Sequence, residues 1–198
     1  MFQSPIECQY PMKEYLHNAF NNLLADYLRR HSKVMPVRFD LHYPKNEVMG
    51  TTNTDISRFI AKVVQRFKRA GLDPAYAWVR EQAGSHNPHY HCLLLLNGHK
   101  TRSSNMVFNV AEQLWGSTIG RDARGLVNRC NKNRNGEYQT NGDIIHRQGS
   151  FPHVERQIGY MAKPGGKGEA LDGLRDFGMS RLPSFSSGVT VSNLDLFG

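Results

Sequence analysis

Residues 88–96 read Pro88-His89-Tyr90-His91-Cys92-Leu93-Leu94-Leu95-Leu96. The four leucines make a short continuous apolar run, which is typical of a buried central strand. Side chains on a strand alternate between its two faces, so His89 and His91 share one face and Cys92 lies on the other. Two neighbouring imidazoles on a sheet face suit a metal ion, although a packed, hydrogen-bonded histidine pair has the same pattern.

A second strand is predicted just before this one. Residues 75–82 read Ala-Tyr-Ala-Trp-Val-Arg-Glu-Gln, and the Gly84–Pro88 turn that follows predicts a hairpin with residues 89–96. Pairing would bring Glu81 close to both histidines. Two imidazoles and one carboxylate make a three-ligand site with open positions, suited to Mg²⁺ or Mn²⁺, with Zn²⁺ binding well in vitro. The alternative for Glu81 is a surface residue paired with a lysine.

The remaining patterns predict an α+β fold. Residues 34–44 alternate as a strand, with Arg38, Asp40 and His42 on its polar face. Asp40 and His42 could line the site, but we expect this polar face to be solvent-exposed. The hairpin leaves no room for a crossover helix, so we expect a central, mainly antiparallel β-sheet of about five strands, flanked by helices. The chain is predicted to form one domain over residues 1–182, with a tail at 183–198. Helices are expected at 12–30 (part of the domain or an extension), 54–70, 104–115 and 152–163, short strands within 119–150, and irregular structure in the last 30 or so residues.

Composition restricts the function classes. The 198 residues include 25 basic and 17 acidic ones, a net charge of +8 that makes a polyanionic partner such as nucleic acid plausible. Three widely spaced cysteines do not suggest a disulfide framework and fit a reducing cytosol. No apolar stretch is long enough to span a bilayer, and we expect no membrane association. The start lacks the pattern of a signal peptide, which also favours the cytoplasm.

The predicted helix at 152–163 contains a possible nucleophile. Tyr160 and Lys163 are three residues apart and therefore share a helix face. A tyrosine hydroxyl is a poor nucleophile unless the developing charge is stabilised, and a nearby lysine with a metal-bound phosphate would supply that. Alternatively, Tyr160 packs at a buried helix edge and Lys163 stabilises the helix C-terminus.

Residues 119–150 are basic and rich in Gly and Asn. This composition suits a loop that contacts the phosphates of DNA, and it equally suits an unstructured basic segment. The candidate DNA-binding residues are Arg121, Arg124, Arg129, Lys132 and Arg134.

Three of these segments together resemble a known family. An alternating apolar strand at Val37–Tyr43, then His89-Tyr90-His91, then Tyr160-x-x-Lys163, in that order, resemble the HUH endonucleases of rolling-circle replication. The wider chain, including Trp78–Glu81 and Phe177–Arg181, is similar to the replication initiators of filamentous phages (inoviruses) and their prophage relatives. The resemblance covers roughly residues 35–182.

The resemblance implies an HUH fold with an RRM/ferredoxin-like palm, and a site-specific, metal-dependent nickase and strand transferase for single-stranded DNA. Tyr160 would be the nucleophile, forming a covalent 5′-phosphotyrosine intermediate, and Lys163 would contact the phosphate. His89, His91 and Glu81 would bind Mg²⁺ or Mn²⁺. The DNA would be a replication origin in the cytoplasm of a bacterial host, whose helicase and polymerase are possible partners.

One departure from the family is visible. Some phage initiators carry two tyrosines on this helix, whereas this segment has only Tyr160, which favours a single-tyrosine mechanism. Tyr43 and Tyr138 are weaker candidates for a second nucleophile. The alternatives to an initiator are a transposase or relaxase-type HUH enzyme, a non-catalytic nucleic-acid-binding protein of the same fold, and a protein with a structural zinc site at His89, His91 and Glu81.

Overall fold

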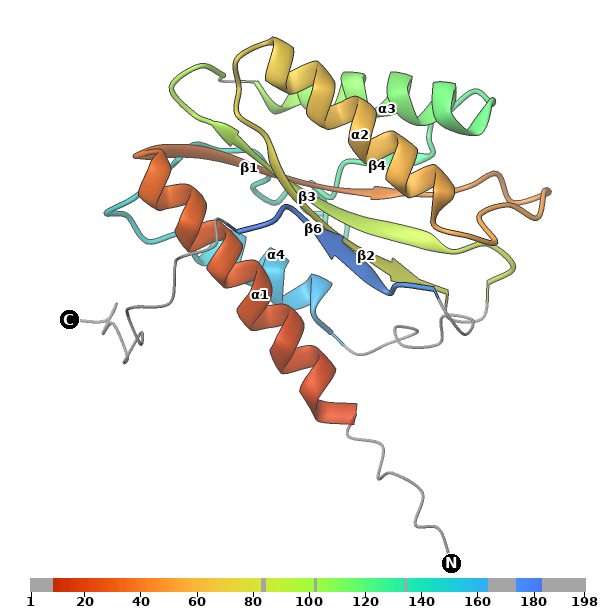
Figure 1. Cartoon of the computed structure of the whole chain (residues 1–198), viewed down its shortest axis with the longest axis horizontal. Coiled ribbons are helices and arrows are strands. Elements are labelled where there is room, and N and C mark those ends of the chain that lie inside the picture. The colour runs from red at the N-terminus through yellow and green to blue at the C-terminus, as the bar shows by residue number, and fades with distance from the viewer. Residues whose placement is uncertain (1–8, 83–84, 102, 134, 164–173, 183–198) are drawn as a thin grey trace, which may run out of the picture.

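The structure is a computed structural model that describes residues 9–82, 85–101, 103–133, 135–163 and 174–182. It has the predicted α+β fold, with a mainly antiparallel open sheet flanked by four helices (Figure 1). The elements are α1 (Gln9–Arg30), β1 (Lys33–Leu41), α2 (Thr54–Arg69), β2 (Ala75–Glu81), β3 (His89–Asn97), α3 (Ser104–Ile119), β4 (Val127–Asn128), β5 (Ile145–His146), α4 (Pro152–Met161) and β6 (Phe177–Met179).

The strands lie in the order β4-β1-β3-β2-β6, and β5 pairs with the other end of β1. The predicted hairpin is present, because β2 and β3 pair antiparallel with Glu81 opposite His89. On its other side β3 pairs with β1, which places Asp40 opposite His91. The His-Tyr-His segment therefore lies between two strands that each bring an acidic residue to it.

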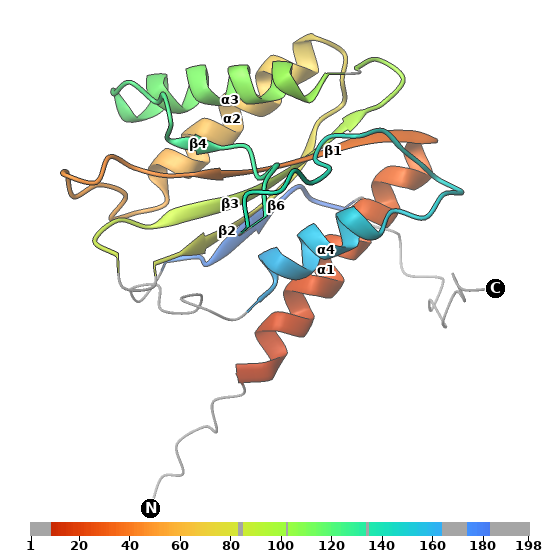
Figure 2. The same ribbon diagram turned by 180° about the vertical axis from the view of Figure 1, so that it is seen from behind.

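Helices cover both faces of the sheet. Figure 1 shows α2 and α3 on one face and α1 and α4 on the other, and the view from behind in Figure 2 agrees. Alternation along β3 sends Tyr90 and Cys92 into the core under α2 and α3, and Leu93 and Leu95 into the core beside α1 and α4. His91 consequently lies on the α4 side, and Cys92 lies on the opposite face as predicted.

The core under α2 and α3 is built around Trp115, which is fully buried. Its indole Nε1 donates a hydrogen bond of 2.7 Å to the carbonyl of His42, and it packs against the rings of Tyr43 and Phe59. The helix α3 continues four residues beyond the predicted end, because Ile119 is also buried in this core. Gly120, with φ of 68°, then ends the helix in the left-handed conformation.

The predicted helix at 12–30 is present and lies within α1, which extends at least from Gln9 to Arg30. The prediction of irregular structure near the C-terminus was wrong in part. Part of the segment predicted to be irregular forms β6, which pairs with β2. The close approach depends on Gly178, where an added Cβ would lie 2.6 Å from Nε1 of Trp78. The predicted tail at 183–198 lies outside the described residues.

The sequence led us to expect neither membrane-spanning helices nor a disulfide framework. None of the helices in the part of the chain that the structure describes is long and apolar enough to cross a membrane. Cys92 and Cys130 are free and buried.

Candidate active site

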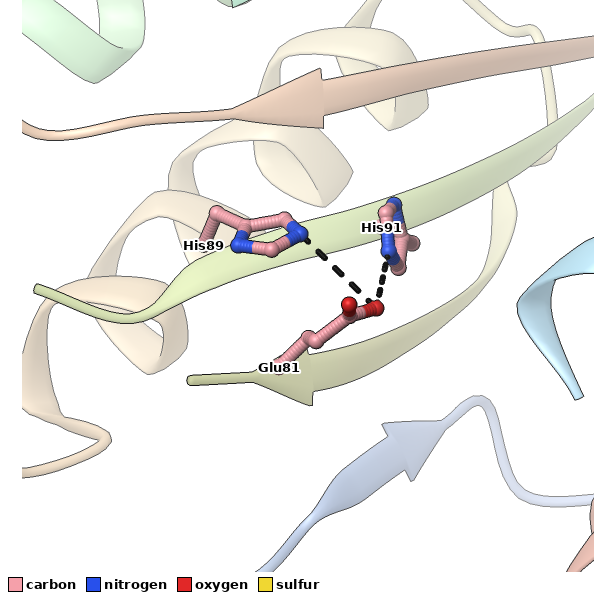
Figure 3. Close-up of side chains that lie close together, drawn as sticks. All are labelled: Glu81, His89 and His91. Atoms are coloured by element: carbon pink, nitrogen blue, oxygen red, sulfur yellow. Dashed lines mark hydrogen bonds and ion pairs between the residues drawn. The ribbon is translucent and has the colours of Figure 1, made fainter. Parts of the chain in front are cut away.

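Glu81, His89 and His91 form the cluster that the sequence predicts (Figure 3). One ligand atom from each residue lies within 4.8 Å of the others. Nε2 of His91 is 2.8 Å from Oε2 of Glu81, and Nε2 of His89 is 3.8 Å from the same oxygen. The hairpin register produces this arrangement, because it places Glu81 beside His89 with both side chains on the α4 face of the sheet.

Asp40 of β1 holds the other side of His91. Its Oδ1 lies 2.8 Å from Nδ1 of His91. Both ring nitrogens of His91 thus face carboxylates, which accept hydrogen bonds and do not donate them. Although burial lowers the pKa of His91, the hydrogen bonds to Asp40 and Glu81 outweigh it and raise the pKa above its usual value. In the metal-free protein a proton therefore lies between His91 and Glu81.

The donor set fits a divalent cation. A cation between Nε2 of His91 and the Glu81 carboxylate would take the place of that proton, and Asp40 would then orient the ring through Nδ1, as carboxylates do behind many histidine ligands. Burial, followed by the charge of His91, lowers the pKa of His89 to about 4, so His89 is neutral and able to bind metal at ordinary pH. Two imidazoles and one carboxylate suit Mn²⁺ and Zn²⁺, and the carboxylate also suits Mg²⁺.

Tyr160 on α4 lies next to this cluster. Its ring meets that of His91 edge-on, with centroids 5.4 Å apart and planes at 85°. The tyrosine is 39% exposed. Nζ of Lys163 lies 5.7 Å from the centre of the Tyr160 ring. The predicted helix at 152–163 ends earlier, because α4 stops at Met161 and Lys163 follows it outside the helix, so the predicted shared helix face was wrong although the two side chains are neighbours. The structure thus brings together Glu81, His89, His91, Tyr160 and Lys163, which come from three separate segments.

The polar face of β1 was predicted to be solvent-exposed, and this was wrong. Arg38 is 6% exposed and Asp40 is 7% exposed, because this face of β1 lies against α4. Nη2 of Arg38 donates a 3.0 Å hydrogen bond to Asp40. Asp40 keeps a pKa well below its usual range: burial alone would raise it, but the hydrogen bond from His91 and the charge of Arg38 outweigh burial. The sequence signal for this burial was the alternation along β1, which places Arg38 and Asp40 on the same face of the sheet as His89 and His91.

His42 extends the site toward a cavity. Its ring stacks on that of His89, with centroids 5.3 Å apart and planes at 15°. Beyond it lies a polar cavity of about 570 Å³, a volume in the range of small-ligand sites. Its lining combines amide, carboxylate and guanidinium groups and consists of His42, Glu112, Gly125, Val127, Asn128, Arg129 and Asn131.

Of the predicted DNA-binding residues that the structure describes, one lines the cavity and the others lie on the exposed surface. Arg129 lines the cavity beside His42, and its guanidinium lies 5.4 Å from the ring of Phe108. Arg121 pairs with Glu47, and Arg124 pairs with Asp122, both on the exposed surface. Lys132 is exposed and forms an isolated β-bridge with Tyr138, while Arg134 lies outside the described residues.

Comparison with models of protein families identifies a relationship. The family model of the YagK/YfjJ C-terminal domain matches residues 6–180, which is most of the chain and includes every element of the sheet and site described above. No curated protein and no solved structure matches. The chain therefore belongs to the YagK/YfjJ C-terminal domain family.

Proposed function

We propose that the protein is a metal-dependent nickase and strand transferase for single-stranded DNA, of the HUH type, that initiates rolling-circle replication. The observation that carries the proposal is the edge-on contact of 5.4 Å between the rings of Tyr160 and His91. A tyrosine that is 39% exposed, with its ring beside a cluster of two histidines and a glutamate, supports phosphoryl transfer to that tyrosine.

In the proposed reaction the hydroxyl oxygen of Tyr160 attacks a backbone phosphorus of the DNA. A bond forms between this oxygen and phosphorus, and the phenolic proton passes to solvent, which reaches the exposed ring. The bond from phosphorus to the 3′ oxygen breaks with its electron pair, and this oxygen takes up a proton to become a free 3′ hydroxyl. The 5′ phosphate stays on the tyrosine, so the bond energy is retained for rejoining.

Each residue of the site would have a separate role in this reaction. Glu81, His89 and His91 would hold the divalent cation, which when bound would polarise the phosphate as a Lewis acid. Lys163, just beyond the end of α4 and with its Nζ 5.7 Å from the Tyr160 ring centre, would attract the scissile phosphate. Arg129 in the cavity beside His42 would hold the neighbouring DNA.

The other tyrosines support a single nucleophile. Tyr43 is buried on the opposite face of the sheet and donates a hydrogen bond to Asp55, where no phosphate can reach it. Tyr138 is exposed on the loop where it forms a β-bridge with Lys132.

As part of the proposal, the substrate is single-stranded DNA at a replication origin in a bacterial cytoplasm, with host helicase and polymerase as partners. Contact between Tyr160 and His91 favours this enzyme over a non-catalytic binding protein. A transposase or relaxase of the same type would use the same residues.

A covalent-adduct assay tests the proposal. The protein is incubated with a pool of random-sequence single-stranded oligonucleotides labelled at the 3′ end, because the fragment joined to tyrosine carries that end. Mn²⁺, Mg²⁺ or EDTA is added, and the products are separated on a denaturing gel. We expect a labelled protein band with either metal and none with EDTA.

The control compares two tyrosine variants. Tyr160→Phe should abolish the labelled band and retain DNA binding, whereas Tyr138→Phe, which removes an exposed hydroxyl outside the cluster, should leave the band intact. An adduct that persists in Tyr160→Phe, or a wild-type protein that binds Mn²⁺ and DNA without forming any adduct, would overturn the proposal.

A further inference from the structure

The buried Arg38 of β1 connects the candidate metal centre with the candidate nucleophile. We propose that Arg38 is a positioning residue, which holds the Tyr160 ring in place beside the cluster of Glu81, His89 and His91. This inference rests on the proposed function for its catalytic consequence, and its structural part can be tested separately.

The burial of Arg38 needs an explanation. Its same-face neighbours in this core, such as Leu93, are apolar, and an apolar side chain would fill the space without a charge to desolvate. One terminal nitrogen, Nη2, donates to both oxygens of Asp40, at 3.0 and 3.3 Å. Nε is buried and has no hydrogen-bond partner among the described residues. The guanidinium is thus not fully used by the ion pair with Asp40.

Besides Asp40, Nη2 lies 3.4 Å from Nδ1 of His91, and the face of the guanidinium contacts the Tyr160 ring. The central carbon of the guanidinium lies 4.2 Å from the ring centre, a close cation–π distance. The same ring meets the His91 ring edge-on. Two contacts of different kinds, one with a cation and one with an imidazole edge, therefore define where the tyrosine lies. Asp40 bonds to both Arg38 and His91 and fixes these two partners relative to each other.

Arg38 is itself fixed by an unusual backbone clamp. The side-chain amide of Asn141 accepts a hydrogen bond from the backbone N–H of Arg38 at 2.9 Å and donates one to its carbonyl at 2.6 Å. The amide thus replaces a strand at this point of the β1 edge, since β4 pairs with residues 40–41 and β5 with residues 33–34.

The loop that carries Asn141 also holds α4. Nε2 of Gln157, three residues before Tyr160, donates a hydrogen bond of 3.1 Å to the carbonyl of Thr140. Consecutive loop residues therefore bind the strand that carries Arg38 and the helix that carries Tyr160. The loop thus fixes the backbones that carry the Arg38 guanidinium and the Tyr160 ring relative to each other. Such precision suits the positioning of a nucleophile, because small misplacements of reacting groups slow a reaction strongly.

The test uses Arg38→Met, Arg38→Lys and a matched control, Arg80→Met. Arg80 is also a buried arginine with an unpartnered Nε among the described residues, but it lies on β2 and its side chain faces the α2 and α3 side, away from Tyr160. Lysine keeps the charge and the stem of Arg38 but cannot lay a planar group on the ring while bonding to Asp40. It also provides a folded variant if Arg38→Met does not fold.

We measure single-turnover adduct formation with a nicked sequence from the oligonucleotide pool, and Mn²⁺ affinity by calorimetry. Arg38→Met should lower kcat about 100-fold, because the nucleophile is no longer held in place. KM should stay within about threefold of wild type. The Mn²⁺ affinity should fall by much less than kcat, because Arg38 acts on the metal cluster only through Asp40 and a 3.4 Å contact with His91. Arg38→Lys should recover part of the loss, and Arg80→Met should change stability but not kcat. An active wild type with an equally active Arg38→Met, or equal losses of kcat and Mn²⁺ affinity, would overturn the inference.

NMR with isotope-labelled tyrosine separates this inference from the proposed function. The Tyr160 signal is identified by its absence in Tyr160→Phe. Arg38→Met should move this signal toward the position of free tyrosine, and Arg80→Met should leave it in place. An unmoved signal in Arg38→Met overturns the contact itself. A moved signal in a protein that forms no adduct confirms the contact and rejects only the proposed reaction.

Discussion

Asp40 and His91 lie opposite each other on the β1–β3 pair, and Oδ1 of the aspartate is 2.8 Å from Nδ1 of the histidine. The aspartate also accepts from Arg38. One buried carboxylate thus contacts both halves of the site, the candidate metal cluster and the residue that lies against Tyr160. This relationship determines which properties each substitution should change.

Asp40→Asn should weaken Mn²⁺ binding about 10- to 100-fold, the usual consequence of altering the hydrogen-bond partner of a histidine ligand. The change keeps the shape of the side chain, removes its negative charge and replaces one accepting oxygen by a donating NH₂ group, so His91 loses basicity. Calorimetric titration with Mn²⁺ measures the effect. Asp143→Asn, at an exposed carboxylate, is the control and should bind Mn²⁺ as wild type does. Equal affinity in the two variants would remove Asp40 from the site.

Metal binding should depend on pH through His91. Its pKa is raised, so the stabilisation that protonated His91 gives the metal-free protein is present at lower pH and is lost as the pH rises through that pKa. A cation replaces this proton, so Mn²⁺ affinity should increase over the same range, with release of about one proton per ion. His89, with its pKa of about 4, should contribute only in acid. Calorimetry in buffers of different ionisation enthalpy counts the protons, and binding without proton release would contradict the assignment.

Arg129→Ala should weaken binding of single-stranded DNA and reduce its salt dependence by about one released counterion. The reason is that Arg129 lines the cavity beside His42. Arg124→Ala should have a smaller effect, because Arg124 already pairs with Asp122. Fluorescence anisotropy at several salt concentrations compares the two variants. A larger loss in Arg124→Ala would show that DNA follows a different path.

Asp73→Asn should remove part of the acid dependence of stability. Asp73 pairs with His31 and Arg30 at the end of α1, and its φ of 45° is one that asparagine also adopts. Burial raises the pKa of Asp73, but the hydrogen bond from His31 and the charge of Arg30 outweigh burial and lower the pKa. This contribution is present above the unfolded-state pKa of about 3.9 and is lost as the pH falls through the folded-state pKa.

The effect of Asp73→Asn should be small, below about 1 kcal/mol, because the carboxylate is 45% exposed and the pairs are screened by water. Urea unfolding at neutral pH should show the difference. The two proteins should converge below the folded-state pKa, and a constant difference at every pH would mean that the carboxylate charge is not involved.

Two glycine substitutions should change stability in opposite directions. Gly178→Ala places a Cβ 2.6 Å from Nε1 of Trp78, so β6 must shift. The free energy of unfolding should therefore decrease by about 1–3 kcal/mol. At Gly159 in α4 an added Cβ meets nothing within 4 Å, so alanine should stabilise the helix by about 0.5–1 kcal/mol. Thermal unfolding measures both, and hydrogen exchange should locate the change for Gly178→Ala in β2 and β6. Equal melting temperatures would contradict the close packing.

The sequence was sufficient for the parts of the site that depend on short-range pattern. The apolar run after His91 and the alternation along 89–96 predicted the strand and the face of each histidine. A short turn after Glu81 fixed the hairpin register and so the third member of the cluster. The short separation of Tyr160 and Lys163 predicted that their side chains lie near each other, although Lys163 falls beyond the end of α4 and not on its face.

The missing parts depend on contacts between distant segments. Arg38 and Asp40 were expected to be exposed, because charged residues at alternate strand positions usually face water. Their burial results from the packing of α4, which lies more than a hundred residues further along the chain. The strand β6 has three residues, too few for a periodic pattern, and its pairing depends on the fit of Gly178 against Trp78.

Because side chains alternate along β1, substitutions on its two faces should have different effects. Phe39 and Leu41 pack in the core under α2 and α3, so their substitution should change how much folded protein a cell contains. Arg38 and Asp40 lie on the other side as a buried ion pair, so their substitution should change the chemistry of the site in addition to stability. Insertion of one residue before Arg38 would exchange the two sets between the faces. The strand should therefore tolerate a range of replacements but no change in length.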